Sequence, residues 1–257
     1  MIIEKQTLNY ILLLTMFDFI IYVVGEIEAS FRAFLDIIIP RGCCSCGRAL
    51  VRKELFICCH CLAEFPQTRF DCKEQTELEK RFWGRFPIER ATALYYFHHE
   101  GVRHLIHRIK YFNNRKLALY MGVFMANQIK DRSTFFEGID IIIPVPLHPK
   151  RIHRRGYNQS QILANGVSKS IGVYVDNRII KRAIYNPTQT LLNRDERWDN
   201  VQDIFQLTDP DTIANKHILL IDDVLTTGST IVACAQELMK APNVKVSILT
   251  LAMARIH

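Results

Sequence analysis

Two adjacent aspartates and a run of hydroxyl side chains follow a strongly apolar segment near the C-terminus. The segment HILLI (217–221) predicts a buried strand that delivers Asp222 and Asp223 at its carboxyl end. The residues that follow are Val224, Leu225, Thr226, Thr227, Gly228, Ser229 and Thr230. We expect 224–228 to form a short loop that leads into a helix. Ligands of open α/β sheets bind at this edge, and the N–H groups of such a loop cradle an anion of phosphate size.

The two acids complement this anion cradle, because carboxylates accept hydrogen bonds from sugar hydroxyls and help to hold Mg²⁺. The pattern therefore predicts a ribose 5-phosphate site. The sequence contains neither the G-x-x-x-x-G-K of a P-loop nor the G-x-G-x-x-G of a dinucleotide-binding turn. The alternative is a plain strand–turn–helix with two exposed acids, but turn chemistry alone does not explain two acids followed by T-T-G-S-T.

Four cysteines form two C-x-x-C pairs separated by eleven residues: Cys43, Cys46, Cys58 and Cys61. Four thiolates at such a spacing suit tetrahedral Zn²⁺, and a closed four-thiolate shell predicts a structural role. Seven of the eight cysteines lie within 43–72, which favours a local metal site in a reducing compartment over disulfides. Cys44, Cys59 and His60 leave the choice of ligands open, and reduced or redox-active cysteines are the alternative to a metal.

The composition is that of a soluble globular protein, because 49% of the 257 residues are apolar and 23% are charged. These values exclude wholesale disorder, collagen-like repeats and a polytopic membrane protein. The net charge is +7, and the stretch 101–160 carries all of that excess. A basic surface of this kind favours an anionic partner, namely a nucleotide, a sugar phosphate or nucleic acid, while a solvated basic face is the alternative.

Apolar runs that alternate with helical patterns predict an α/β domain with a largely parallel sheet. The predicted strands are 91–97, 139–143, 217–221 and 244–252, and the predicted helices are 102–111, 117–129, 159–170 and 230–240. We expect three parts: an apolar and amphipathic helical segment (1–40), a zinc module (41–75) and an α/β domain (85–257). The polar stretch 72–81 is interpreted as a linker.

The N-terminal segment contains an apolar run, 10–24, that Asp18 interrupts. It is shorter than the roughly 20 residues that span a bilayer, and no secretory cleavage pattern follows it. A docked helix, a weak membrane contact and a start site at Met16 are three alternatives that the sequence leaves open. We expect a cytoplasmic protein, with no membrane partner indicated and an unspecified oligomeric state.

The segment 217–231 resembles the phosphoribosyl pyrophosphate (PRPP) motif of type I phosphoribosyltransferases. The two C-x-x-C pairs, IHRIKYFNNRKLA (106–118), IIIPVPLHPKRIHRRGYNQS (141–160) and the polar stretch 188–205 add to this resemblance. Together they identify the chain from Cys43 onward as similar to the ComF family, which includes the competence protein ComF and GntX. Only the first forty or so residues fall outside the resemblance.

The resemblance implies a type I phosphoribosyltransferase fold in which Asp222 and Asp223 are the catalytic acids. They would bind the ribose hydroxyls of PRPP, with Mg²⁺ nearby, and the loop 224–230 would hold the 5-phosphate. Residues facing the pyrophosphate would follow the first buried strand: Pro144, Val145, Pro146, Lys150, Arg151, Arg154 and Arg155. A flexible loop, 189–200, would close over the ligand and would include Gln189, Arg194 and Arg197.

Two functions are compatible with these features. The first is transfer of a phosphoribosyl group from PRPP to an unknown acceptor, with release of pyrophosphate. The alternative, which the resemblance implies, is a non-catalytic role in competence, in which the protein binds single-stranded DNA or a helicase-like partner and PRPP acts at a sensor site. Arg108, Lys110 and Arg115 could form a nucleic-acid face with Tyr111 and Phe112, although we expect these two aromatic rings to be half-buried.

Overall fold

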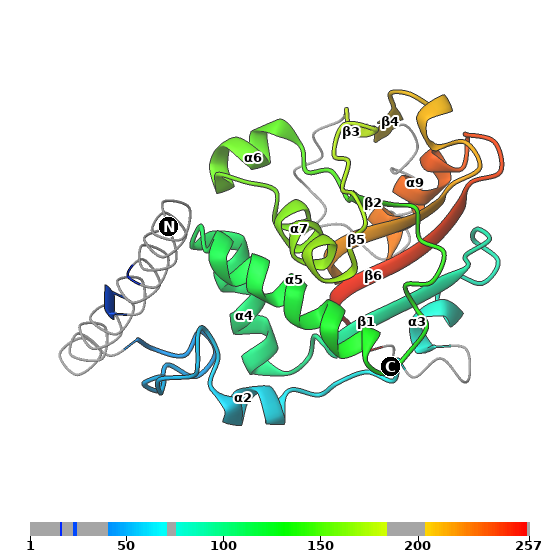
Figure 1. Ribbon diagram of the computed structural model, residues 1–257. Helices are drawn as coiled ribbons and strands as arrows, with labels where there is room; N and C mark the ends of the chain where they lie inside the picture. Colours follow the sequence, from blue (N-terminus) through cyan, green and yellow to red (C-terminus); the bar gives the residue numbers. More distant parts are fainter. Residues whose placement is uncertain (1–15, 17–22, 25–40, 71–75, 184–203, 256–257) are drawn as a thin grey trace, which may run out of the picture. The chain divides into compact units, whose positions relative to one another are not determined.

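The computed structural model describes residues 41–70, 76–183 and 204–255, together with residues 16, 23 and 24 (Figure 1). It divides into two compact units, Met1–Leu62 and Ala63–His257. The rest of the segment 1–40, Cys72 and the expected flexible loop 189–200 lie outside the described residues. None of the helices within the described ranges combines the length and the apolar character that crossing a membrane requires.

The larger unit is built on a parallel four-stranded sheet with the strand order β1-β6-β5-β2. Its strands are β1 (Arg90–Tyr96), β2 (Ile141–Pro144), β5 (His217–Leu225) and β6 (Lys245–Met253). The central strands read as continuous apolar runs because both of their faces are covered. The predicted α/β class with a largely parallel sheet is therefore confirmed.

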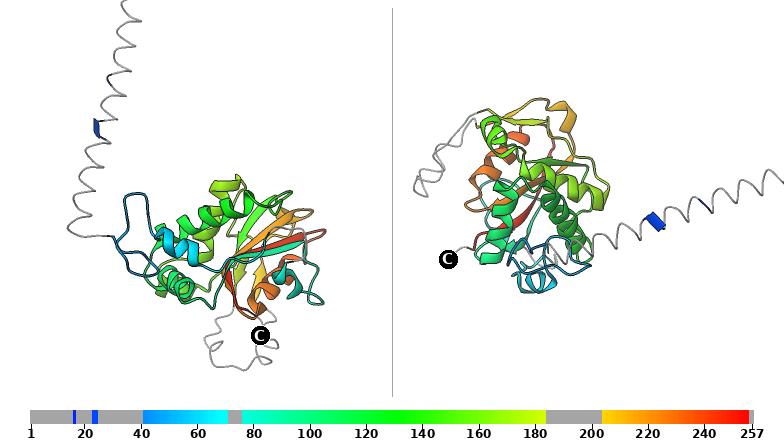
Figure 2. Two further views of the ribbon diagram at one scale, coloured as in Figure 1. Left: turned by 90° about the horizontal axis from the view of Figure 1, so that it is seen from below. Right: turned by 90° about the vertical axis from the view of Figure 1, so that its left-hand side faces the viewer.

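Helices and a small two-stranded sheet cover the two faces of this sheet. One face carries α4 (Glu100–Tyr111), α5 (Arg115–Lys130) and α7 (Gln159–Ile171). The other carries α9 (Ser229–Leu238), the antiparallel pair β3 (Ile180–Arg182) and β4 (Phe205–Leu207), and the 3-10 turn η1 (Asp211–Ile213). The right-hand view of Figure 2 shows the green helices and the orange helix on opposite sides of the red strand.

Two glycines allow α5 and α7 to pack with their backbones in close contact. A Cβ atom at Gly122 would lie 2.2 Å from the carbonyl oxygen of Leu163, and one at Gly166 would lie 2.4 Å from that of Leu119. Both distances are far below a van der Waals contact, so only glycine fits. This close approach fixes α7 over the sheet, with its N-terminal end near the carboxyl ends of the strands.

The polar stretch before β1 is not a linker over its second half. Residues Glu77–Lys80 form helix α3, which Thr76 begins with a capping box to Glu79. Leu78 and Phe82 are 1% and 0% exposed and belong to the hydrophobic core on the α9 face. The linker interpretation of 76–81 is therefore wrong, because two apolar side chains four residues apart bury this segment despite its polar composition.

Candidate ribose phosphate site and cysteine cluster

Strand β5 is longer than the sequence predicts. The register pairs Asp222 with Thr250, Val224 with Ala252 and Leu225 with Met253, so β6 offers hydrogen-bonding partners well beyond the aspartates. The expectation that the loop begins at residue 224 is therefore wrong. The loop consists of residues 226–228 alone, and α9 begins at Ser229.

The two aspartates project to opposite faces of the sheet, because successive side chains of a strand alternate. Asp222 shares its face with Ile218 and Leu220, on the α9 side. Its Oδ1 accepts a hydrogen bond of 2.7 Å from the Oγ of Ser160, at the start of α7, and one of 2.9 Å from the backbone N–H of Asp223. The N-terminal turn of α7 therefore holds Asp222 in place.

Asp223 lies deep in the structure, at 3% exposure, and meets a cation from α4. The Nζ of Lys110 is 3.3 Å from its Oδ2, which is ion-pair distance. This contact lacks hydrogen-bond geometry, so the buried Oδ2 has no hydrogen-bond donor within the described structure. A buried carboxylate oxygen without a donor is costly, and it is therefore a place where a ligand hydroxyl or a metal-bound water fits.

The environment of the acid pair favours a proton on Asp222. Burial is the larger cause, and the neighbouring Asp223 carboxylate is the next; together they raise the pKa of Asp222 to about 7. The hydrogen bond from Ser160 and the charge of Lys110 act in the opposite direction. A cation such as Mg²⁺ bound near the acid pair would reduce this repulsion.

The loop after β5 forms a small cradle at the N-terminus of α9. Gly228 has a φ of +85° and has no side chain to cap the helix. The N–H of Ser229 donates to the Oγ of Thr227 at 3.4 Å, and the N–H groups that follow it in the first turn of α9 can bind a ligand. The Oγ atoms of Thr227 and Ser229 lie 3.0 Å apart and add hydroxyl groups to the same cradle. A cavity of about 110 Å³ lies over the loop and is lined by Asp222 and residues 224–231.

Two arginines from the segment around α3 support this loop from outside the cradle. The guanidinium of Arg81 donates to the carbonyl oxygen of Thr226 at 3.2 Å and also to that of Ala254. Arg85 donates to the carbonyl oxygen of Thr227 at 3.5 Å. Because the carbonyl groups are engaged in this way, the N–H groups of the loop are directed to its other side, where an anion would bind.

The turn after β2 lies beside the acid pair. Pro144 pairs with Ile221, and the N–H of Val145 donates to the carbonyl oxygen of Ile221 at 2.9 Å. The side chain of Asn158 donates to the carbonyl oxygen of Val145 at 3.0 Å and also caps α7. Pro146 is half-buried in the same turn. The structure therefore brings together the residues of this turn, α7 and the end of β5.

The cations that follow this turn lie on a short helix, α6 (Pro149–Arg155), which has no buried residue. Lys150 and Arg154 are exposed, whereas Arg151 and Arg155 are half-buried. Arg155 donates to Gln159 and lies 5.5 Å from the ring centre of Tyr111. The remaining predicted residues of this group, Gln189, Arg194 and Arg197, lie in the part of the chain that the structure does not describe.

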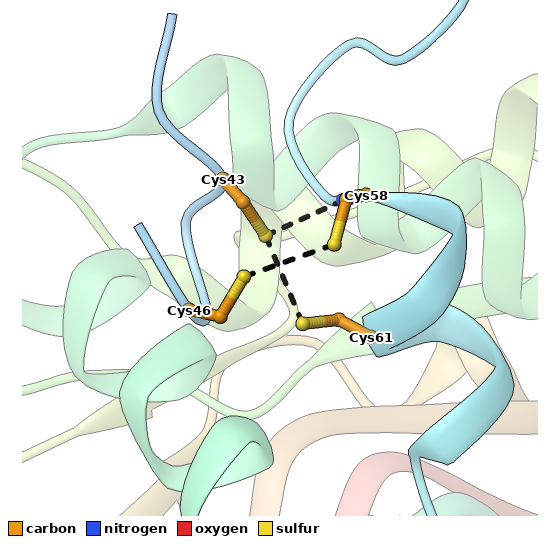
Figure 3. Close-up of side chains that lie close together, drawn as sticks. All are labelled: Cys43, Cys46, Cys58 and Cys61. Atoms are coloured by element: carbon orange, nitrogen blue, oxygen red, sulfur yellow. Dashed lines mark hydrogen bonds between the residues drawn. The ribbon is translucent and has the colours of Figure 1, made fainter. Parts of the chain in front are cut away.

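The smaller unit brings four thiols together. The Sγ atoms of Cys43, Cys46, Cys58 and Cys61 all lie within 4.8 Å of one another and point to a common centre (Figure 3). Two of the separations are 3.9 Å (Cys43–Cys61) and 3.8 Å (Cys46–Cys58). Four sulfurs bonded to one tetrahedral zinc at about 2.3 Å would be separated by about 3.8 Å. The cluster is therefore compatible with structural zinc.

The geometry also distinguishes among the neighbouring candidates, since Cys44, Cys59 and His60 are not members of the four-sulfur group that the described residues form.

Burial raises the pKa of the Cys43 thiol, but hydrogen bonds from backbone N–H groups, including that of Cys58 at 3.3 Å, outweigh burial and lower that pKa to about 7. Such N–H groups stabilise a thiolate, which is the form that binds metal.

The aromatic pair at the end of α4 is exposed. Tyr111 and Phe112 are 58% and 62% exposed, so the expectation that they are half-buried is wrong. The reason is that Val102, Leu105, Ile106 and Ile109 already form the buried stripe of α4. The ring centre of His107 lies 4.7 Å from that of Tyr111 and 5.7 Å from that of Phe112.

Comparison with known proteins identifies the relatives of this chain. No family model matches it. It is 31% identical over 202 residues to DNA utilization protein YhgH of Salmonella typhimurium, which covers 77% of this chain and 85% of that protein. It is 30% identical over 225 residues to Competence protein F of Haemophilus influenzae, which covers 84% of this chain and 93% of that protein. The chain belongs to the YhgH and competence protein F (ComF) family.

Solved structures similar to this ComF-family chain include phosphoribosyltransferases. A glutamine PRPP amidotransferase from B. subtilis, complexed with ADP and GMP, matches 55% of this chain and 30% of its own, with a TM-score of 0.36 and 15% identity. A hypoxanthine phosphoribosyltransferase from Staphylococcus aureus matches 56% of this chain and 70% of its own, with a TM-score of 0.34 and 16% identity. Because both TM-scores lie below 0.5, these likenesses carry no weight for a substrate.

The roles of several site residues of this ComF-family chain cannot be predicted from the sequence. Ser160, Lys110 and Arg81 all contact the acid pair or its loop from distant parts of the chain. For Ser160 there is a weak signal, because it follows the helix cap Asn158 by two residues and thus lies in the first turn of α7. Lys110 is a candidate in the sequence only for a nucleic-acid face, and the structure instead pairs it with Asp223. Nothing in the sequence points to Arg81, since it is one of many basic residues and its partner is set by packing.

Proposed function

We propose that this protein binds PRPP together with Mg²⁺ at the end of β5 and transfers its phosphoribosyl group to an acceptor, with release of pyrophosphate. One observation carries the proposal: a carboxylate pair with an oxygen that lacks a hydrogen-bond donor lies directly beside the N-terminus of α9 and its hydroxyl-lined cradle. Acceptors of hydrogen bonds for a sugar and donors for a phosphate are thus adjacent, as a ribose 5-phosphate requires.

Each group has a distinct task in this proposal. The N–H groups of residues 226–230 and the hydroxyls of Thr227 and Ser229 would hold the 5-phosphate, which is dianionic near neutral pH. Asp222 and Asp223 would accept hydrogen bonds from the ribose hydroxyls. Mg²⁺, when bound, would neutralise the pyrophosphate charge. Such a reaction depends on positioning and electrostatic stabilisation, in agreement with a site that has no activated nucleophile among the residues named above.

Isothermal titration calorimetry of the full chain with PRPP in the presence and absence of Mg²⁺ tests binding. We expect Mg²⁺-dependent binding that the double variant Asp222→Asn/Asp223→Asn loses. Asp211→Asn is the matched control, because it removes an exposed carboxylate outside the site. Absence of PRPP binding to the parent protein would refute the proposal. Pyrophosphate release measured across a panel of nucleobases and amines then separates transfer from binding alone.

A second candidate function is binding of single-stranded DNA; one of the relatives is named a DNA utilization protein. The observation that supports it is a group of aromatic and basic side chains at the end of α4, which we call the platform: Arg108, Tyr111, Phe112 and Arg155. Tyr111 and Phe112 present their rings, Arg108 lies 5.7 Å from the ring centre of Phe112, and Arg155 lies 5.5 Å from that of Tyr111. Rings for base stacking beside guanidinium groups for phosphates are typical of proteins that bind single strands.

Fluorescence anisotropy with a labelled single-stranded oligonucleotide tests this candidate. Tyr111→Ala/Phe112→Ala should weaken binding, since stacking contributes about 1–3 kcal/mol per base. Tyr174→Ala is the control, because Tyr174 is equally exposed, at 61%, and lies outside the platform. Equal affinities for the parent, the double variant and the control would exclude the platform as the binding surface. Binding should also weaken steeply with salt.

For the smaller unit we propose a single structural Zn²⁺ held by Cys43, Cys46, Cys58 and Cys61. The sulfur separations of 3.8 and 3.9 Å support it. Four thiolates complete a tetrahedral shell and leave no position for substrate, so the metal would organise the fold of residues 41–62 and take no part in catalysis.

A further inference from the structure

Arg182 is a buried cation without a partner. It is 8% exposed, and its Nε is buried without a hydrogen bond. Within the described structure its side chain forms no hydrogen bond and no ion pair, and the specific contact of the guanidinium is with the ring of Phe205, at 5.6 Å from the ring centre. Burying an unpaired charge is costly, so a guanidinium in this state is rarely retained for packing alone.

The position of Arg182 relates it to the acid pair. It ends β3, where Ile180 and Arg182 point inward and Lys181 points to solvent. Ile180 packs in the same core cluster as Ile218 and Leu220 of β5, whose face continues into Asp222. Arg182 is therefore buried on the side of the sheet from which Asp222 projects.

The surrounding charges favour an anion at this place. Burial is the main cause that lowers the pKa of Arg182; the positive charge of Arg151 on α6 acts in the same direction, and the negative charge of Asp222 opposes them. Two guanidinium groups on separate elements thus repel each other, and among the described residues the one carboxylate that acts against this repulsion is Asp222, together with the Cys234 thiol. A ligand group with two or more negative charges would remove this imbalance.

We propose that Arg182 binds the pyrophosphate group of PRPP. This inference rests on the proposed PRPP site, of which it names a further binding residue. The 5-phosphate is excluded as the partner of Arg182, because the loop 226–228 supplies its cradle at the N-terminus of α9 and Arg182 is not among the residues that line this cradle. The planar fork of a guanidinium matches two oxygens of a phosphoryl group, which a point charge such as Lys does less well.

Calorimetry on the full chain with Mg²⁺ and three probes, PRPP, ribose 5-phosphate and inorganic pyrophosphate, tests the inference. Arg182→Gln should weaken the binding of PRPP and of pyrophosphate roughly 10- to 100-fold, which is the effect of losing a charged hydrogen-bonded pair. It should change the affinity for ribose 5-phosphate by less than about twofold. Lys181→Gln is the matched control, since it removes a neighbouring charge that faces solvent. It should leave the binding of all three probes unchanged.

The outcomes separate this inference from the proposed function. If the parent binds PRPP and Arg182→Gln binds it equally well, or loses ribose 5-phosphate to the same degree, Arg182 is a structural residue and the inference is overturned alone. If the parent binds neither PRPP nor ribose 5-phosphate, both proposals fall. If Arg182→Gln does not fold, Arg182→Lys replaces it. A loss of affinity of about fivefold or more that is confined to PRPP supports the inference, and an unchanged affinity for PRPP overturns it.

Discussion

If the cysteine cluster holds the proposed zinc, its removal should unfold residues 41–62 while the α/β unit stays folded. The aliphatic side chains that this segment buries to below one tenth exposure are Leu50 and Ile57. Their burial contributes about 3–6 kcal/mol. Ordering roughly 20 residues costs about 20 kcal/mol at the lower estimate for the backbone. A structural zinc contributes about 10–16 kcal/mol, and burial alone falls far short of the ordering cost without it.

Two variants separate the proposed metal ligands from their neighbours. Cys61→Ser removes a sulfur that lies 3.9 Å from that of Cys43, whereas Cys59→Ser removes an exposed thiol outside the four-sulfur group. We expect about one zinc per chain for the parent and for Cys59→Ser, measured by mass spectrometry of the metal content, and a large loss for Cys61→Ser. Limited proteolysis of the full chain should then cleave within 41–62 in Cys61→Ser only.

A strong chelator provides the same test without a substitution. Added to the parent protein, it should make residues 41–62 sensitive to protease, and restored Zn²⁺ should reverse this effect. The reasoning is refuted if Cys61→Ser keeps a full equivalent of zinc, or if a parent protein free of metal resists protease in this segment. Either result would mean that contacts other than a metal supply the missing stabilisation.

Three further predictions concern the larger unit. Gly228→Ala should lower stability by about 1–2 kcal/mol in denaturant unfolding, because its φ is +85° and a Cβ would lie 3.4 Å from the ring of Phe82; an unchanged midpoint would contradict it. Gly166→Ala should destabilise the fold more strongly, since its Cβ would lie 2.4 Å from the carbonyl oxygen of Leu119, and thermal unfolding measures this. Because the pKa of Asp222 is raised from 3.8 to about 7, the folded state holds its proton more tightly than the unfolded state. Stability of the ligand-free protein should therefore fall as pH rises from about 4 to about 7, and Asp222→Asn should flatten that slope; an equally steep slope in the variant would refute the assignment.

The sequence alone determined the parts whose signals are local. An apolar run followed by a hydroxyl-rich turn indicates a buried strand that leads into a helix, because strand burial and loop chemistry depend on neighbouring residues. The end of that strand is not local, since pairing with β6 extends it to Leu225. The two C-x-x-C pairs likewise carry their own spacing, so the four-sulfur group needs no long-range information. The alternation of apolar runs and helices gave the α/β class for the same reason.

Only the tertiary structure decided which distant side chains meet these local features. Lys110 reaches Asp223 because α4 covers the face of the sheet from which that carboxylate projects, and Ser160 reaches Asp222 because α5 and α7 pack through glycines. The exposure of Tyr111 depends on which side of α4 faces the core. The isolation of Arg182 depends on the pairing of β3 with β4 and on the core beneath them. Such contacts join residues that are far apart in the chain, so the spacing of residues in the sequence does not predict them.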